Sequence, residues 1–218
     1  PRPVPRLESP RNLALALKLL SQCEGRGAHL ICFPEYFPFS GEPELARAAR
    51  RLQAYLVAGL VEEEGGHGGK RYNTATLFDP QGSLVGRQRK VTLGALERRG
   101  YGVVPGQGWQ VLETDLGRLG LPLCIDFWGV SEAAQQLSAQ RVDLIVNPSI
   151  FPILRGHWLR GALVRAFEYY LPVVGVNAAQ FAAEIAGRRY PMQGGKSFAI
   201  QPPVPKNGVA MAALVRHW

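Results

Sequence analysis

The stretch GRLGLPLCIDFWG, residues 117–129, is the strongest indication of fold class in the sequence. Its apolar run predicts a strand at 118–125, which pairs as a hairpin with 109–114 around the turn at residues 115–117. Ser131 follows as a candidate N-cap for a helix at 132–140. A strand that turns directly into a helix is typical of an α/β domain, and it presents the residue at the turn, Cys124, at a sheet edge.

Helices and strands alternate in both directions from this stretch. Apolar residues at helical spacing predict helices at 11–23, 43–54 and 157–170. Strands are predicted at 28–33, 55–61, 72–79, 83–89, 142–148 and 172–179, with a glycine-rich hairpin tip at 62–71, an irregular stretch at 92–108, and a last hairpin of 197–202 and 208–215. We therefore expect a single α/β domain over residues 1–218, built as a four-layer α-β-β-α sandwich of two mixed sheets flanked by helices.

Composition narrows the class of protein. Apolar residues make up 46% of the 218 residues and charged residues 19%, enough to bury a core. The longest apolar runs are too short to cross a bilayer, and we expect no membrane partner and no secretion signal. The net charge of +8 comes mostly from scattered arginines that do not alternate with aromatic residues, so no nucleic-acid partner is expected.

The cysteines and histidines favour neither disulfides nor metal. Cys23, Cys32 and Cys124 are an odd number without a pairing pattern, which indicates a reducing compartment and a cytoplasmic location. Neither the cysteines nor the histidines have the spacing of metal ligands, so no metal is expected. Cys23 and Cys32 are predicted to be buried packing residues.

Three residues at strand ends could carry chemistry. A thiolate at the turn after a strand, such as Cys124, is placed to act as a nucleophile, although a free cysteine is as often a small buried apolar residue. Glu35 lies among aromatic residues and prolines, where a raised pKa would suit a general base, but a carboxylate in a loop is more often a cap or an ion-pair partner. Lys90 and Glu97, each taken alone, are ordinary charged surface residues.

Taken together, these positions carry a resemblance. PE, RK and CID each stand at the end of a predicted strand, and the chain is similar in this to the nitrilase superfamily of carbon–nitrogen hydrolases, amidase-like branch. The similarity runs along nearly the whole chain through HLICFPEYF (29–37), RYNTATLFDPQG (71–82), RQRKVTL (87–93), VVPGQG (103–108), GRLGLPLCIDFWG (117–129), VDLIVNPS (142–149), HWLRGALVRAFEYYLPVVGVNAA (157–179) and GGKSFAIQP (194–202). The family usually begins with a further strand, and this N-terminal strand is expected to be missing here.

The resemblance implies a catalytic triad. Glu35 would be the general base, Lys90 the cation that stabilises an oxyanion, and Cys124 the nucleophile. Glu97 would be the family's second glutamate, which positions the lysine or the substrate.

Four further residues are expected to line the substrate site. The backbone N–H of Ile125 and the side chain of Asn147 stand where family members hold the developing oxyanion. Tyr36 and Trp128 are expected to contact the substrate.

The implied activity is hydrolysis of a small amide to an acid and ammonia or an amine through a thioester, with no cofactor. A nitrilase or an N-carbamoyl amidohydrolase on the same triad, or a non-catalytic binding protein on this fold, remain as alternatives. The family also implies a homodimer or higher even oligomer, and Trp158, Phe167, Tyr169 and Tyr170 on the predicted helix at 157–170 look exposed enough to form part of the interface.

Overall fold

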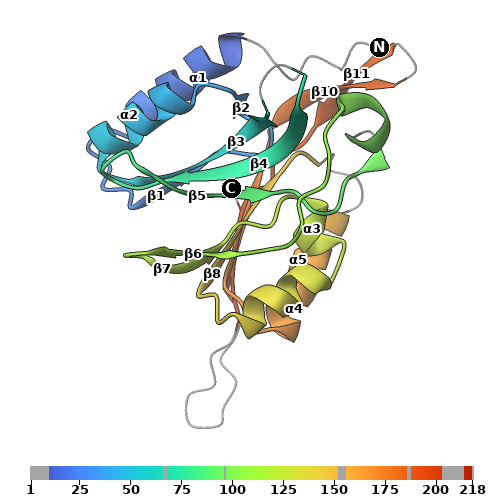
Figure 1. Ribbon diagram of the computed structural model, residues 1–218. Helices are drawn as coiled ribbons and strands as arrows, with labels where there is room; N and C mark the ends of the chain where they lie inside the picture. Colours follow the sequence, from blue (N-terminus) through green and yellow to red (C-terminus); the bar gives the residue numbers. More distant parts are fainter. Residues whose placement is uncertain are drawn as a thin grey trace. The chain divides into compact units, whose positions relative to one another are not determined.

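The computed structural model describes residues 10–65, 68–95, 97–151, 156–185, 188–202 and 214–217 (Figure 1). The chain forms two compact units, Pro1–Gln107 and Gly108–Trp218. No described helix is long and apolar enough to cross a membrane.

The first unit is a mixed sheet with helices on one face. Its elements are α1 (Pro10–Ser21), β1 (Leu30–Cys32), β2 (Pro38–Phe39), α2 (Glu42–Leu52), β3 (Tyr55–Glu64), β4 (Lys70–Phe78), β5 (Leu84–Arg89) and a π-helical turn η1 (Glu97–Tyr101). The strand order is β1-β3-β4-β5, and the short strand β2 also pairs with β3. Strands β1 and β2 run parallel to β3, whereas β3, β4 and β5 are antiparallel.

Helices α1 and α2 pack against each other and cover one face of this sheet (Figure 1). Their apolar faces meet the sheet in a core of fully buried side chains that includes Leu20, Leu45, Leu56 and Phe78. Burying each such side chain contributes about 1.5–3 kcal/mol, so this core fixes β3 and β4 as a rigid base for the residues at their edges.

The second unit repeats this plan with a different topology. Its elements are β6 (Val111–Thr114), β7 (Gly117–Gly120), α3 (Ile125–Trp128), α4 (Glu132–Ala139), β8 (Leu144–Ser149), α5 (His157–Glu168), β9 (Val173–Asn177), β10 (Gln180–Ile185), β11 (Arg188–Gln193), β12 (Phe198–Gln201) and β13 (Leu214–His217). The main sheet has the order β13-β12-β9-β8-β7-β6, and β10 pairs with β11 as a separate hairpin. The three central strands β7, β8 and β9 are parallel, and the outer pairs are antiparallel.

Helix α5 packs on β9 and β12, and α3 packs on α5 and α4. The core between them contains Phe127, Leu137, Trp158, Ala162 and Phe198. The predicted class is therefore confirmed: the protein is α/β, with two mixed sheets flanked by helices.

The structure corrects three local predictions near the central motif. The strand predicted at 118–125 ends at Gly120, because Pro122 has no N–H to donate and the chain then turns at Cys124. Ser131 precedes α4 but makes no side-chain capping hydrogen bond. The irregular stretch at 92–108 contains η1.

Other differences lie further out. No element was predicted for the β10–β11 hairpin. The hairpin tip at 62–71 is shorter, because β3 and β4 pair as far as Glu64 and Lys70, and residues 66–67 lie outside the described ones. The last hairpin is present as β12 and β13, although most of its predicted second strand, residues 208–213, also lies outside the described ones, as do residues 1–9.

Candidate active site

Glu35 lies in a tight turn between β1 and β2. Phe33 N–H donates to Val57 O before the turn, and Gly59 N–H donates to Phe37 O after it, so β3 holds the turn at both ends. Gly59 has no side chain to keep the turn away: a Cβ there would come 2.5 Å from the Tyr36 nitrogen and clash with Pro34 O. The absence of a side chain on β3 therefore lets the backbone that carries Glu35 pack directly on the strand.

Glu35, Asn73, Lys90 and Glu97 form a buried group that we call the carboxylate cluster. Glu35, Lys90 and Glu97 are only 2%, 4% and 6% exposed, and Asn73 is fully buried. Lys90, directly after β5, places its Nζ 2.7 Å from Glu35 Oε1 and 2.6 Å from Glu97 Oε2. Two carboxylates around one amine favour its charged ammonium form, so the cluster holds a fixed cation between two anions.

Asn73 closes the cluster from β4. Its Nδ2 donates to Glu35 Oε1 at 2.7 Å and to Glu97 Oε1 at 2.8 Å. The hydroxyl of Tyr36 also donates to Glu97 Oε1 at 2.8 Å, and the ring of Tyr101 packs edge-on against Tyr36. Burial, followed by the charges of Glu97 and Glu35, raises the pKa of Tyr36, which keeps its hydroxyl a hydrogen-bond donor.

Glu97 accepts four hydrogen bonds. Oε2 accepts from Lys90 Nζ and from Gly94 N–H, and Oε1 accepts from Asn73 and Tyr36. Burial would raise the pKa of Glu97, but the charge of Lys90 and these hydrogen bonds outweigh it and hold the pKa below its ordinary value. Glu97 is therefore a fixed anion whose lone pairs are already used.

Cys124 stands at the turn between Leu123 and α3. Its backbone has φ 46° and ψ −116°, a conformation that residues with a side chain rarely adopt. Its own N–H donates to Pro148 O at 2.9 Å, and its Sγ lies 4.0 Å from Ile150 O. The strained turn thus sets the direction of the sulfur and ties it to the end of β8.

The backbone N–H of Ile125, the residue after Cys124, has no hydrogen-bond acceptor among the described residues. The N–H groups of Cys124, Asp126 and Phe127 donate to backbone carbonyls, whereas no acceptor for the Ile125 N–H is found among the described residues. Ile125 is the first residue of α3, where helical geometry leaves N–H groups without an internal partner. A free donor beside a nucleophile is what an oxyanion needs.

Asn147 supports this turn from within. It is fully buried, and its Nδ2 donates to Pro122 O at 2.7 Å and to Cys124 O at 3.2 Å. Its Oδ1 accepts from Ser149 Oγ at 3.1 Å and from Trp158 Nε1 at 3.3 Å. Since its side chain is engaged on both sides, we expect Asn147 to hold the turn rather than contact substrate directly.

Trp128 and Trp158 lie in different settings. Trp128 is partly buried and packs on Phe151 with ring centroids 4.7 Å apart. Trp158, which the sequence suggested as an exposed interface residue, is buried instead and packs on Phe198 with centroids 4.5 Å apart. That prediction was wrong because Trp158 faces the core side of α5.

Each unit therefore holds one group of the predicted site residues. Glu35, Tyr36, Lys90 and Glu97 gather in the first unit, and Cys124, Ile125 and Asn147 in the second. That the two groups form one triad stays a prediction. Within the described residues, no three histidine, cysteine, aspartate or glutamate side chains gather as a metal ion would need.

Sequence reasoning missed Asn73. It stands in the motif RYNTATLFDPQG, where the one amide side chain of the predicted strand at 72–79 was the available signal.

Comparison with known sequences points to one family. A sequence profile described as carbon-nitrogen hydrolase matches residues 3–203. Among curated proteins, the omega-amidase NIT2 of Xenopus tropicalis is 29% identical over 194 residues, which cover 78% of this chain and 69% of the relative. The protein of the same name from Mus musculus has the same identity and coverage.

Solved structures share the fold. A carbon-nitrogen hydrolase from Helicobacter pylori G27 matches with a TM-score of 0.78 at 21% identity, over 88% of this chain and 76% of that one. An amidase from Nesterenkonia sp. AN1 matches with a TM-score of 0.76 at 24% identity, over 99% and 87%, and in that structure an acetamide moiety is covalently added at the active site cysteine. With a profile match over most of its length, this chain belongs to the carbon-nitrogen hydrolase family.

Proposed function

We propose that this enzyme hydrolyses the carbon–nitrogen bond of small carboxamides through a thioester on Cys124, with Glu35 as the base and Lys90 as the stabilising cation. The observation that carries the proposal is the turn at Cys124, where a strained backbone presents the sulfur next to the unclaimed N–H of Ile125. The similarity to omega-amidases and to an amidase with a modified cysteine supports an amide as substrate.

Acylation would use both groups of residues. Glu35 takes the thiol proton of Cys124, and the thiolate attacks the amide carbonyl carbon to form a tetrahedral oxyanion. Lys90 and the Ile125 N–H stabilise this oxyanion, each such donor being worth roughly 3 kcal/mol. The carbon–nitrogen bond then breaks as Glu35 returns the proton to the nitrogen, which releases ammonia or an amine and leaves the thioester.

In deacylation Glu35 again acts first as a base and then as an acid. Glu35 takes a proton from water, the hydroxide adds to the thioester carbonyl, and the carbon–sulfur bond breaks to release the acid. The departing thiolate recovers the proton from Glu35. Glu97 takes no part in these transfers, because its lone pairs already accept four hydrogen bonds, and it keeps Lys90 charged and in place.

Substrate is a small molecule in this proposal, and an ω-amide of a dicarboxylic acid is one candidate because the curated relatives are named omega-amidases. Tyr36 and Trp128 remain candidate substrate contacts. The three free cysteines are in keeping with a cytoplasmic location.

The nucleophile is tested by intact-mass labelling with a small haloacetamide. We expect rapid single labelling that Cys124→Ala removes. Cys32 should stay unlabelled, because burial raises the pKa of its thiol to about 12. Both Cys23 and Cys32 are half-buried rather than buried as the sequence suggested, and slow background labelling is expected at Cys23. Unchanged rapid labelling of Cys124→Ala would remove Cys124 from the reaction.

The division of labour is tested by ammonia release over a panel of amides, N-carbamoyl compounds and nitriles. Glu35→Gln should abolish turnover and slow thioester formation. Lys90→Met should lower kcat about 100- to 1000-fold while Cys124 still reacts with haloacetamide. Glu44→Gln, in the partly exposed ion pair with Arg47 on α2, is the matched control and should keep full activity. A Glu35→Gln variant with undiminished turnover would end the proposal.

A further inference from the structure

We propose that Asn73 is a positioning residue, which holds the carboxylates of Glu35 and Glu97 and the backbone of Lys90 in one fixed arrangement. The inference rests on the proposed function, since it takes Glu35 as the base. Asn73 would act through these three residues and would not contact the substrate.

Asn73 contacts every charged member of the carboxylate cluster. Its side-chain Nδ2 donates one hydrogen to Glu35 Oε1 and the other to Glu97 Oε1, at 2.7 and 2.8 Å. Its backbone carbonyl accepts the Lys90 N–H at 2.8 Å. Lys90 Nζ donates to the same two carboxylates, so the side chains form a closed ring of hydrogen bonds.

The chemistry of the ring fixes which way the amide faces. Ionised carboxylates only accept hydrogen bonds, so a flipped amide would set Oδ1 against two carboxylate oxygens. In the orientation present, Oδ1 is buried, and among the described residues it has no hydrogen-bond partner. Leaving a buried acceptor unsatisfied costs about 1–3 kcal/mol, which the two hydrogen bonds from Nδ2 to charged carboxylates have to offset. The presence of an amide at position 73 is best explained by the hydrogen bonds that its Nδ2 donates to Glu35 and Glu97.

Neighbouring residues of β4 show that a polar side chain there need not serve the cluster. Thr76 is also fully buried, and its Oγ1 has no partner in the described part of the chain. Thr74 Oγ1 contacts Tyr72 O and Glu62. Thr76 is therefore a matched control: a valine there has nearly the same shape and replaces only the hydroxyl with a methyl group.

The position of Asn73 has a consequence for the protonation of Glu35. A hydrogen bond to a carboxylate favours its charged form, and the active base must be charged. The titratable groups that face Glu35 within the first unit are Lys90, Glu97, Tyr36 and Tyr101, and all four stay in the variants below. Removing the amide should therefore move the acid limb of kcat/KM to higher pH.

Three variants test this: Asn73→Ala, Asn73→Asp and Thr76→Val. Asn73→Ala should lower kcat/KM roughly tenfold to a hundredfold, as losing a supporting hydrogen bond does at other sites. Its acid limb should lie above that of the wild type. Asn73→Asp should raise the limb further, because it adds a third carboxylate beside two others. Thr76→Val should leave the pH profile of the wild type unchanged.

A second readout does not need activity. The titration of the Glu35 carboxyl is followed by carbon-13 NMR of glutamate-labelled protein, with the signal assigned by Glu35→Gln. In Asn73→Ala this carboxyl should titrate at higher pH than in the wild type, whereas Thr76→Val should leave it in place. An unchanged Glu35 titration in folded Asn73→Ala would overturn the positioning role. A wild type inactive on every amide would instead overturn the proposed function and leave the NMR result to decide the role of Asn73.

Discussion

At the scale of single residues, the ionisation of Glu97 makes the free energy of unfolding depend on pH. The charge of Lys90 and four hydrogen bonds outweigh the burial of Glu97 and hold its pKa below the ordinary 4.5. A depressed folded-state pKa contributes stability that is complete above the unfolded value and is lost as pH falls through the folded one. The contribution of Glu97 is thus present at neutral pH and declines below about pH 4.5.

We therefore predict that Glu97→Gln lowers the free energy of unfolding at pH 7 by roughly 3 kcal/mol, because Lys90 loses a buried ion-pair partner. The difference from the wild type should narrow as pH falls below about 4.5. Urea unfolding at pH 7, 5, 4 and 3 measures both curves. A difference that stays constant over this range would show that Glu97 is not an ionised partner of Lys90.

At the scale of elements, the packing of β3 against the turn that carries Glu35 makes a second prediction. An alanine at Gly59 would bring its Cβ within 2.5 Å of Tyr36 N and 2.8 Å of the Glu35 carbonyl carbon. Backbone cannot rotate away as a side chain can, so Gly59→Ala should destabilise the fold by about 1–3 kcal/mol and displace the base. Thermal unfolding and ammonia release measure the two effects.

Gly108→Ala is the control, because a Cβ there meets no atom within 4 Å. It should match the wild type in both measurements. If Gly59→Ala kept full activity despite a lower Tm, the turn would not need its close contact with β3 to place Glu35.

The elements also show what the sequence could predict. Helices α1, α2, α4 and α5 agree with their predicted ranges within one or two residues, because apolar side chains at helical spacing, such as Leu13, Leu17 and Leu20, have one buried face. The β10–β11 hairpin was missed because QFAAEI and RRYPMQ lack a regular alternation of apolar and polar residues.

The sequence could predict only those site residues that are charged and lie at the end of a predicted strand. Glu35 lies two residues after the strand predicted at 28–33, and Lys90 directly follows the strand predicted at 83–89, so their meeting could be expected. The contributions of Asn73 and Trp158 depend on hydrogen bonds across strands and helices that no local spacing encodes. Asn147 was placed in the site by resemblance, but its engagement with the turn at Cys124 appears only in three dimensions.

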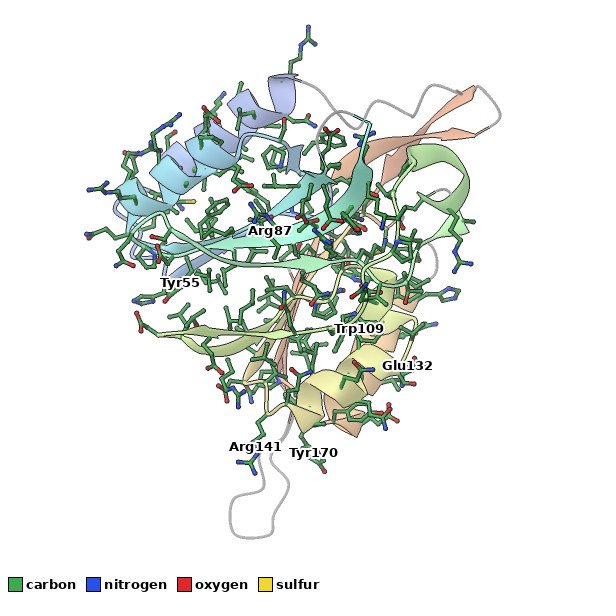
Figure 2. The ribbon with its side chains drawn as sticks, viewed as in Figure 1. Tyr55, Arg87, Trp109, Glu132, Arg141 and Tyr170 are labelled. Carbon is green, nitrogen blue, oxygen red and sulfur yellow. The ribbon has the colours of Figure 1, made fainter. Side chains whose placement is uncertain are left out.

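At the scale of the whole molecule, we predict a homodimer or higher even oligomer. Val164, Phe167 and Tyr170 on and just after α5 are 56%, 40% and 63% exposed, and Tyr170 projects away from the ribbon (Figure 2). Apolar side chains gathered on one exposed face are typical of an interface between subunits. Light scattering should give at least twice the chain mass of 23.9 kDa.

Phe167→Glu should shift this mass toward the monomer, because a charge in an apolar contact is costly to bury. Leu15→Glu, on the exposed side of α1, should leave the mass of the wild type unchanged. A wild type that stays monomeric at micromolar concentration would contradict the prediction.

The backbone of Cys124 has a consequence for evolution and for engineering. Its φ of 46° and ψ of −116° are expected to cost about 1–3 kcal/mol for any residue with a β-carbon, and glycine would escape that penalty. We predict that Cys124→Gly melts about 2–4 °C above Cys124→Ala, whereas Ala162→Gly, in the regular helix α5, melts below the wild type. Scanning calorimetry of the variants decides this, and equal melting of the two Cys124 variants would mean that the turn is unstrained. A related protein that no longer catalyses the reaction would gain stability from a glycine at this position. Glycine here in a related chain would therefore indicate that the chain has lost its catalytic activity.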